Sequence, residues 1–349
     1  MTTRQPTEFQ TIPAIDISEL LNGDDAQRHA VAKLLGQAAR EVGFFYVVGH
    51  GISQACQDAL FAQTRRLFDL PLEQKMAYYI GKSDNHRGYV PAGEEAPDPT
   101  KADAKEAFDL SFELPEDHPD VIAGTPMLGA NVWPEIDGFA NDVYAYYEAV
   151  FGVGQALMQG FALSLNLDAD HFLQHVRRPP SQLRLIHYPY DPTVEDAQGI
   201  GAHTDYECFT LLRPTAPGLE VMNGAGDWVD VPYRDDALIV NIGDMLEIWT
   251  NGEFVATSHR VRKVAEERYS FPLFFAADYH TIVAPLPQLV ERDGQANYEP
   301  LAAGDHLWAQ TIQTFNYLKK RFANGEIQLP EGARGTATLG QHARHKDDA

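Results

Sequence analysis

One short stretch of the sequence combines an imidazole with a carboxylate at a spacing suited to metal binding. His203 and Asp205 lie two residues apart, so on a β-strand both side chains point to the same face. His259 follows much later, at the end of another strand-like run. Two histidines and one carboxylate on a β scaffold can hold non-haem Fe(II) with coordination positions left open, and catalytic zinc accepts the same ligands. We therefore predict a metal site here, with iron and zinc both open as its occupant.

A second group of residues could bind an anion near the predicted metal site. In the segment Arg268-Tyr-Ser270, the alternation of a strand puts the guanidinium and the Ser270 hydroxyl on one face. A guanidinium fork suits a carboxylate, and a buried cation without an anionic partner is costly. Tyr188 offers a phenol towards the same carboxylate, and Arg184 adds a second cation. The alternatives are an internal ion pair for Arg268 and a core role for Tyr188.

Charge and composition disfavour several classes of partner. The chain has 349 residues, and 50 Asp and Glu against 27 Lys and Arg give a formal net charge of −23, which repels nucleic acid and anionic lipid. Only two cysteines are present, so we expect no disulfide framework and a reducing compartment. No run approaches the ~18 apolar residues of a membrane span, and the first residues contain no apolar leader. We expect a cytoplasmic protein that acts on a small molecule, with no nucleic-acid, membrane or obligate protein partner.

The spacing of apolar residues predicts helices in several segments and mainly strands from about residue 183. Helical spacing of apolar residues occurs over 26–42, 54–68, 134–165 and 307–322. Pro134 suits the first position of the longest of these helices, and residues 44–48 read as a buried strand. From about residue 183 the apolar period changes to two and turn signals recur, which is typical of a sandwich or jelly roll. Asn251-Gly252 predicts a β-hairpin between residues 246–249 and 254–256.

This pattern predicts a mainly β fold with flanking α-helices, in which the β part is a sandwich or a jelly roll. We expect one structural unit made of three regions. Residues 1–175 supply helices and strands that complete the barrel. Residues 176–285 form the jelly-roll core with the metal and anion sites, and residues 286–349 form a C-terminal helix and a flexible tail.

The sequence resembles the isopenicillin N synthase-like family of Fe(II)/2-oxoglutarate dioxygenases over nearly its whole length. The segments 12–17 and 41–52 are similar to the N-terminal region of that family, and the segment 241–252 with His259-Arg-Val resembles its core signature. The resemblance implies a distorted double-stranded β-helix of the cupin-like, jelly-roll type. It also implies iron ligands and residues that bind the distal carboxylate of 2-oxoglutarate. The implied iron ligands are His203, Asp205 and His259, and the implied 2-oxoglutarate residues are Arg268, Ser270 and Tyr188.

Within this family, the segments 88–95 and 199–206 are similar to bacterial ethylene-forming enzyme-like members. This closer resemblance implies substrate contacts for Arg184, Tyr206 and Glu95. The further loop candidates for the substrate are Arg87, Tyr89 and Glu94. For the two glutamates, solvated surface charge is the alternative. Gln313 stands where those members carry a cation, so we expect neither L-arginine as the substrate nor ethylene as the main product.

The resemblance implies an oxidoreductase that uses Fe(II), 2-oxoglutarate and O2. Such an enzyme oxidises a small molecule, most often by hydroxylation, and releases succinate and CO2. Three alternatives stay open: a 2-oxoglutarate-dependent enzyme that forms ethylene and succinate, a 2-oxoglutarate-independent oxidase of the isopenicillin N synthase type, and a metal-binding sensor or pseudoenzyme.

Overall fold

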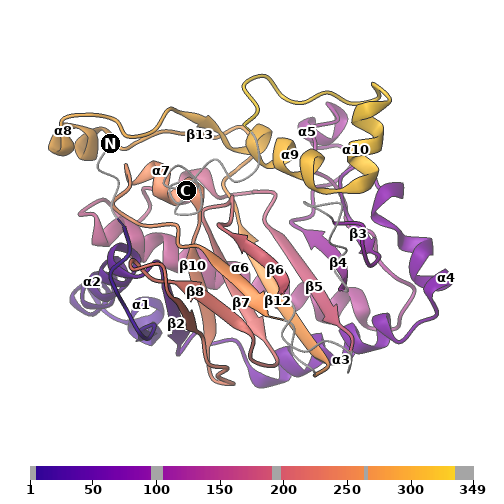
Figure 1. Cartoon of the computed structure of the whole chain (residues 1–349), viewed down its shortest axis with the longest axis horizontal. Helices are drawn as coiled ribbons and strands as arrows, with labels where there is room; N and C mark the ends of the chain where they lie inside the picture. Colours follow the sequence, from indigo (N-terminus) through magenta and orange to yellow (C-terminus); the bar gives the residue numbers. More distant parts are fainter. Residues whose placement is uncertain (1–4, 96–104, 191–197, 263–265, 335–349) are drawn as a thin grey trace.

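In a computed structural model of the chain, the structure describes residues 5–95, 105–190, 198–262 and 266–334 (Figure 1). Within these residues the strands form an eight-stranded sheet, a four-stranded sheet and a short two-stranded pair. The larger sheet has the order β1 (Ala14–Asp16), β2 (Phe44–Val48), β10 (Leu238–Ile242), β7 (Phe209–Pro214), β12 (Arg268–Phe275), β5 (Gln182–Tyr188), β4 (Glu106–Ser111) and β3 (Gly88–Val90). The smaller sheet has the order β6 (Gln198–His203), β11 (His259–Arg262), β8 (Leu219–Met222) and β9 (Trp228–Asp230), and β13 (Ile282–Val283) pairs with β14 (Leu301–Ala302).

The two larger sheets pack face to face. One buried cluster contains Phe44 and Ile239 from the eight-stranded sheet together with Val221 and Val261 from the four-stranded sheet. Figure 1 shows β6 and β8 lying across β7 and β12, with helices behind and above them. This sheet-rich arrangement with flanking helices confirms the predicted fold class. Strands β1 to β4 precede residue 175 and lie in the same sheet as β5, β7, β10 and β12.

Helices and short 3-10 turns surround the sheets. The α-helices are α1 (Ser18–Asn22), α2 (Asp25–Glu41), α3 (Gln54–Phe68), α4 (Leu72–Lys75), α5 (Pro119–Ile122), α6 (Phe139–Ser164), α7 (Asp244–Trp249), α8 (Pro287–Asp293), α9 (Ala303–Thr314) and α10 (Asn316–Ala323). The 3-10 turns are η1 (Met76–Tyr78), η2 (Ile80–Lys82) and η3 (Leu173–His175). The helices expected over 26–42 and 54–68 and the strand over 44–48 are confirmed. None of the helices in the described ranges has the length and apolar character needed to cross a membrane.

Three expectations about elements are wrong, the first two for local physical reasons and the third because of a contact with a distant segment. The longest helix begins at Phe139 instead of Pro134, because Gly138 immediately before it has a left-handed φ of 79°. The expected hairpin at 251–252 is absent, since residues 244–249 form α7. All six residues of α7 are buried, so no exposed face gives the segment a helical or a strand-like alternation of apolar and polar residues. Periodicity alone therefore cannot tell a helix from a strand here.

The expected C-terminal helix over 307–322 is divided at Phe315, whose backbone is extended. Glu94 from a distant loop holds the start of α10 at this break. Its backbone carbonyl accepts a hydrogen bond from Asn316 N, and its carboxylate accepts one from Tyr317 N. A contact between segments far apart in the sequence thus decides where α9 ends. The flexible tail was expected over residues 332–349, and all of it beyond residue 334 lies outside the described residues.

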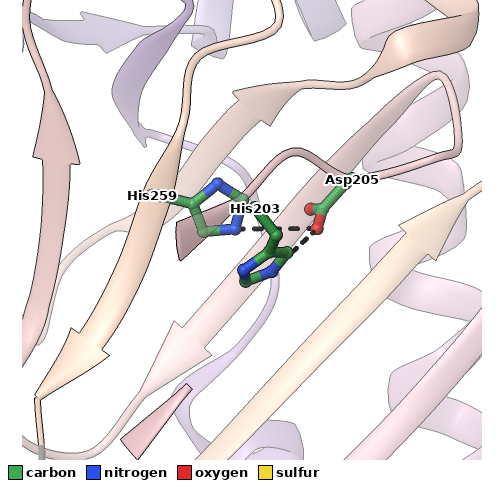
Figure 2. A group of neighbouring side chains, drawn as sticks. All are labelled: His203, Asp205 and His259. Atoms are coloured by element: carbon green, nitrogen blue, oxygen red, sulfur yellow. Dashed lines mark ion pairs between the residues drawn. The ribbon is translucent and has the colours of Figure 1, made fainter. Parts of the chain in front are cut away.

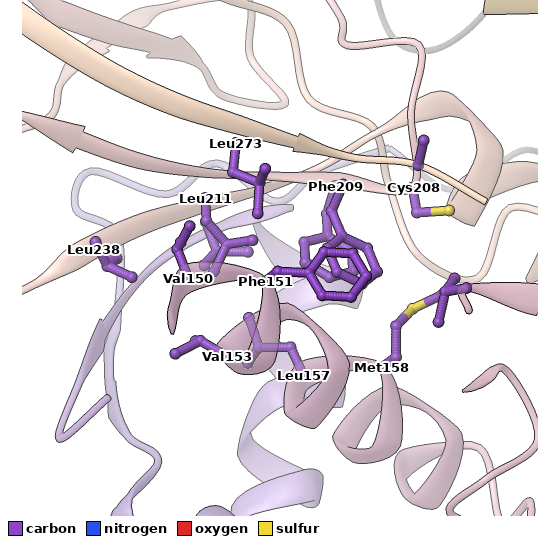
Figure 3. Packing of buried hydrophobic residues seen from close by; sticks show 14 of the residues in the cluster. Val150, Phe151, Val153, Leu157, Met158, Cys208, Phe209, Leu211, Leu238 and Leu273 are labelled. Atoms are coloured by element: carbon purple, nitrogen blue, oxygen red, sulfur yellow. The ribbon is translucent and has the colours of Figure 1, made fainter. Parts of the chain in front are cut away.

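Helix α6 forms the centre of the main core. Figure 3 shows Val150, Phe151, Val153, Leu157 and Met158 of α6 facing Phe209, Leu211, Leu238 and Leu273 of the larger sheet. The α6 side chains keep the helical spacing seen in the sequence, and this packing fixes the back of the sheet that carries the site. Gly154 allows close approach, because a Cβ there would lie 2.4 Å from the Phe275 ring.

We expect Leu157→Ala to lower the free energy of unfolding by about 2–5 kcal/mol, because it removes buried methyl groups and leaves a cavity. Chemical denaturation followed by circular dichroism measures this change. Leu34→Ala is the matched control, since Leu34 lies on α2 and is 52% exposed, and it should change stability by less than about 1 kcal/mol. Equal losses in the two variants would contradict the packing described here.

Candidate metal centre

The pairing of two strands brings the two predicted histidine ligands together. His203 is the last residue of β6, His259 is the first residue of β11, and the antiparallel register places them directly opposite each other. Their ring centroids are 4.3 Å apart. Asp205 follows two residues after β6, and its Oδ1 lies 3.6 Å from the Nε2 atom of each histidine (Figure 2). One possible ligand atom from each of the three residues lies within 4.8 Å of the others, a suitable arrangement for one metal ion.

The Asp205 carboxylate is oriented by hydrogen bonds to its other oxygen. The Thr210 hydroxyl donates a short hydrogen bond to Asp205 Oδ2, and Asn241 Nδ2 donates a second at 2.7 Å. Thr210 on β7 and Asn241 on β10 are themselves a cross-strand pair. These two bonds occupy Oδ2 and leave Oδ1 directed towards the histidines. Such supporting contacts fix the geometry of a metal ligand.

Each histidine is oriented through its Nδ1 atom. Nδ1 of His203 lies 2.8 Å from the carbonyl oxygen of Gly201, and Nδ1 of His259 lies 3.3 Å from that of Thr257. Because a carbonyl only accepts, Nδ1 donates in both cases, and the lone pair of a neutral ring is on Nε2. The two lone pairs therefore face the side on which Asp205 Oδ1 lies.

The charges of the three groups also suit a cation. Burial, followed by repulsion from His203, lowers the pKa of His259 to about 4, so this ring is neutral near pH 7. Burial opposes ionisation of Asp205, but the two histidines and the hydrogen bonds from Thr210 and Asn241 hold its pKa below the usual value. The ionised Asp205 carboxylate beside the neutral His259 ring suits a divalent cation.

The loop that carries Asp205 is held close to the start of α7. Asp244 N donates a 2.8 Å hydrogen bond to the Asp205 carbonyl, and this approach requires glycine at position 243. A Cβ on Gly243 would lie 2.3 Å from the Glu207 carbonyl oxygen, which no real side chain tolerates. Gly243, in the Ile-Gly-Asp portion of the core signature, is therefore needed for the close packing of backbone next to the candidate ligand Asp205.

Arg268 is a buried cation without a carboxylate partner among the described residues. It is 1% exposed, and its Nε and Nη1 atoms have no hydrogen-bond partner within the described chain. Its Nη2 lies 3.5 Å from Ser270 Oγ, and its guanidinium carbon lies 5.1 Å from the Tyr188 ring centroid. Tyr188 is its neighbour across the β5–β12 pairing. Burial lowers the Arg268 pKa and Tyr188 opposes this shift, so the arrangement suits an anionic ligand.

The second predicted cation, Arg184, lies in a buried ionic cluster. It forms a bidentate pair with Asp109, its cross-strand neighbour on β4, at 2.8 and 2.9 Å. Its Nη1 also donates to Glu95 at 2.9 Å, and Lys105 Nζ lies 3.2 Å from the same Glu95 oxygen. Although burial opposes it, these two cations hold the Glu95 pKa well below its usual range. Glu95 is therefore a partly buried, paired carboxylate, in contrast to the solvated surface charge kept open above.

The remaining candidate substrate residues divide into two groups. Tyr206 lies next to Asp205 and packs edge to face against His306 with ring centroids 6.0 Å apart. Arg87, Tyr89 and Glu94 instead have protein partners. Arg87 donates to Asn131 Oδ1 and the Met127 carbonyl, Tyr89 donates to Glu106, and Glu94 accepts from Tyr79 and from Tyr317 N. Hence the structure brings Tyr206 to the candidate ligands, whereas these other three groups bind neighbouring parts of the chain.

Thr210 and Asn241 at Asp205 were not identified from the sequence. Asn241 begins the core signature segment, which was a usable signal. Thr210 lies in an ordinary strand, and only the register of β7 with β10 places it opposite Asn241. His306 and Gln310 on α9 were also missed. They are considered further below, because buried polar atoms of both side chains have no hydrogen-bond partner in the described chain.

Together, the fold and the site define a cupin-like protein with a two-histidine, one-carboxylate group for a metal ion. Comparisons with known proteins identify the family. Residues 12–136 match the model of the non-haem dioxygenase N-terminal region, described from morphine synthesis, and residues 179–277 match that of the 2OG-Fe(II) oxygenase superfamily. Homoarginine-6-hydroxylase 2-ODD-233 of Oryza sativa is 32% identical over 88% of this chain and 99% of its own.

Two solved structures share the fold over most of the chain. A 2OG-Fe(II) oxygenase family protein from Caulobacter crescentus is 30% identical with a TM-score of 0.76, covering 90% of this chain and 99% of its own. T7H of Neurospora crassa, solved with α-ketoglutarate and thymine, is 25% identical with a TM-score of 0.73, covering 91% of this chain and 98% of its own. The chain belongs to the 2OG-Fe(II) oxygenase superfamily. It is a 2-oxoglutarate-dependent dioxygenase that uses Fe(II) and O2 and acts on a small molecule.

We expect Thr210→Val to weaken Fe(II) binding by about 10- to 100-fold, because it removes one of the two hydrogen bonds that orient Asp205 without changing side-chain volume much. An anaerobic Fe(II) titration measures the effect. Thr64→Val is the matched control, since Thr64 is equally buried but donates to the Leu60 carbonyl within α3. Equal Fe(II) affinity in both variants would show that Asn241 alone orients the carboxylate.

Proposed function

We propose that His203, Asp205 and His259 hold the catalytic Fe(II). The observation that carries this proposal is the convergence of two Nε2 atoms and one carboxylate oxygen within 4.8 Å, with the other polar atoms of these side chains already bound to the protein. Three ligands on one side leave the opposite side for other molecules. When bound, the iron activates O2, and oxidative decarboxylation of 2-oxoglutarate to succinate and CO2 accompanies oxidation of the substrate.

We further propose that Arg268, Ser270 and Tyr188 bind the distal carboxylate of 2-oxoglutarate. The support is the unpaired guanidinium in a buried setting, beside a hydroxyl on the same strand face and a phenol on the neighbouring strand. A carboxylate would supply acceptors for the free N–H groups and neutralise the charge. This role favours a 2-oxoglutarate-dependent reaction over the 2-oxoglutarate-independent oxidase alternative.

The proposed reaction is hydroxylation of a small molecule. The rice relative is named for hydroxylation of homoarginine, and T7H was solved with thymine, so relatives act on compounds of this size. For this chain we propose Tyr206, Glu95 and Arg184 as substrate-side residues, because Tyr206 adjoins Asp205 and the other two form a partly buried ion pair in which Glu95 stays partly accessible. Arg87, Tyr89 and Glu94 are assigned the supporting role of holding the loops around them.

Gln313 supports succinate over ethylene as the main product. Its Nε2 donates to the Ala309 carbonyl within α9 and to the Arg334 carbonyl, so this neutral amide already has protein partners. It cannot supply the charge-assisted pair that an arginine carboxylate would need.

The net charge of −23 and the two free cysteines support a cytoplasmic enzyme with no nucleic-acid, membrane or obligate protein partner.

We expect the purified protein to convert 2-oxoglutarate to succinate with Fe(II) and O2, and to release less ethylene than succinate when L-arginine is added. Succinate is measured by chromatography and ethylene by gas chromatography.

We expect each of three ligand variants, His203→Ala, Asp205→Ala and His259→Ala, to lose stoichiometric Fe(II) binding and succinate formation, because each removes one of three ligands. The circular dichroism spectrum should be retained in all three.

The control for this experiment is His29→Ala, which removes an exposed imidazole on α2. One tight Fe(II) per chain in any of the three ligand variants would overturn the assignment of the metal site. Ethylene in excess of succinate would instead overturn the proposed product while leaving the metal site in place.

We expect Arg268→Ala to raise the dissociation constant for 2-oxoglutarate by one to several decades, since truncating one partner of a buried charge pair costs about 2–5 kcal/mol. Arg268→Lys should restore binding only in part, because an ammonium lacks the fork. Anaerobic titration calorimetry with Fe(II) present is the measurement. Arg234→Ala, which removes an exposed cation paired with Asp236, is the control. An unchanged constant for Arg268→Ala would make that residue structural.

A further inference from the structure

His306 on α9 is buried without a hydrogen-bond partner. It is 5% exposed, and neither ring nitrogen has a partner within the described residues. A neutral imidazole has one donor and one acceptor, and buried polar groups in folded proteins are almost always satisfied. Two nitrogens without a partner among the described residues leave this buried ring able to bind a ligand.

The position of His306 relates it to the reaction site. Its ring packs edge to face on Tyr206, the residue after Asp205. It also lines a cavity of about 150 Å³ between the start of α9 and residues 330–334. The ring thus contacts both this cavity and the residue beside a proposed iron ligand, a position from which it could bind the end of a small substrate remote from the metal.

Gln310 supplies a second free polar atom on the same side of α9. It follows His306 by four residues, so the two side chains share a helix face. Gln310 is 1% exposed, its Oε1 has no partner within the described chain, and its Nε2 donates to the Arg334 carbonyl at 3.2 Å. This bond directs the amide towards the segment that forms the other wall of the cavity. The pair offers two acceptors and one donor.

The protonation state of His306 and the available donors and acceptors limit which chemical groups can bind here. Burial and, next, the Arg334 charge lower the pKa of His306 to about 4, so the ring is neutral near pH 7. The cavity is lined by charged residues of both signs, Asp305, Glu331 and Arg334, so charge alone does not select the ligand. A guanidinium or ammonium group has no acceptor, so it would leave the N–H of the neutral His306 ring unsatisfied. A carboxylate has no proton to donate, so it would leave Gln310 Oε1 and one His306 nitrogen unsatisfied. A neutral group that has both N–H donors and a carbonyl acceptor satisfies all three atoms.

We propose that His306 and Gln310 form a subsite for a neutral carboxamide or ureide group of the substrate. The inference rests on the proposed function, because it takes the substrate of that same reaction to reach α9. It assigns His306 and Gln310 to substrate recognition and gives them no part in binding Fe(II) or 2-oxoglutarate.

Matched probes test the inference. L-homocitrulline and L-homoarginine have nearly the same shape, but the first ends in a neutral ureide and the second in a cation, and L-citrulline with L-arginine forms a shorter pair. The panel is completed by L-glutamine and thymine as neutral amides and by L-glutamate as a carboxylate. The readouts are substrate-stimulated succinate formation under O2 and the anaerobic dissociation constant of each probe with Fe(II) and 2-oxoglutarate present.

We expect at least one neutral amide or ureide to stimulate succinate formation more strongly than its charged counterpart. His306→Leu and Gln310→Met should each raise the dissociation constant of that probe by about tenfold, the effect of one lost hydrogen bond to a buried group. His306→Gln should recover part of the affinity, because an amide retains a donor and an acceptor. The matched controls are His29→Leu and Gln37→Met, both at exposed positions on α2.

Each other outcome contradicts the inference. It is wrong if the affinity for the preferred neutral probe is unchanged in His306→Leu and Gln310→Met, if only the cations or L-glutamate bind, or if no neutral probe binds at all. Failure of the proposed function has a different signature, which is the absence of 2-oxoglutarate binding and of Fe(II)-dependent succinate formation in the unmodified protein. Binding of 2-oxoglutarate without binding of any neutral probe would therefore overturn only the subsite.

Discussion

The pair of hydrogen bonds at Asp205 Oδ2 connects the two sheets of this enzyme at the site. Thr210 and Asn241 belong to the larger sheet, whereas His203 and His259 face each other across two strands of the smaller sheet. The carboxylate is therefore positioned by one sheet and the imidazoles by the other. The mutual packing of the sheets sets the distance between the three ligand atoms, so core residues remote from the site contribute to its geometry.

A second constraint is the burial of Arg268 without an anion in the described chain. An unpaired buried charge is destabilising, and the fold offsets this through Tyr188 and Ser270 only in part. By contrast, the Arg184 charge is neutralised inside the protein by Asp109 and Glu95. Two arginines on strands of one sheet thus differ in their electrostatic surroundings, because Arg184 has carboxylate partners within the described chain and Arg268 has none there.

Sequence reasoning could predict the metal group because its signal is local: two residues on a strand share a face, and a third lies in a similar strand. It missed Thr210, because a threonine in a strand acquires its role only from the register with Asn241. It predicted a hairpin where α7 lies, since burial on all sides removes the apolar period. The fold class was thus predictable, whereas contacts set by register or by distant loops were not.

The division of the C-terminal helix shows how substrate selection can be separated from the metal chemistry. Glu94 binds the start of α10, so the break at Phe315 depends on a loop outside the barrel. This break ends α9, the helix that carries His306 beside Tyr206. Changes in α9 or in the loop can therefore alter the polar groups offered to the substrate while the strands that hold Asp205 and Arg268 keep their register. Under the proposed assignments, the residues for Fe(II) and 2-oxoglutarate lie on or next to the strands of the sheets, and the residues that select the substrate lie on helices and loops packed against these sheets.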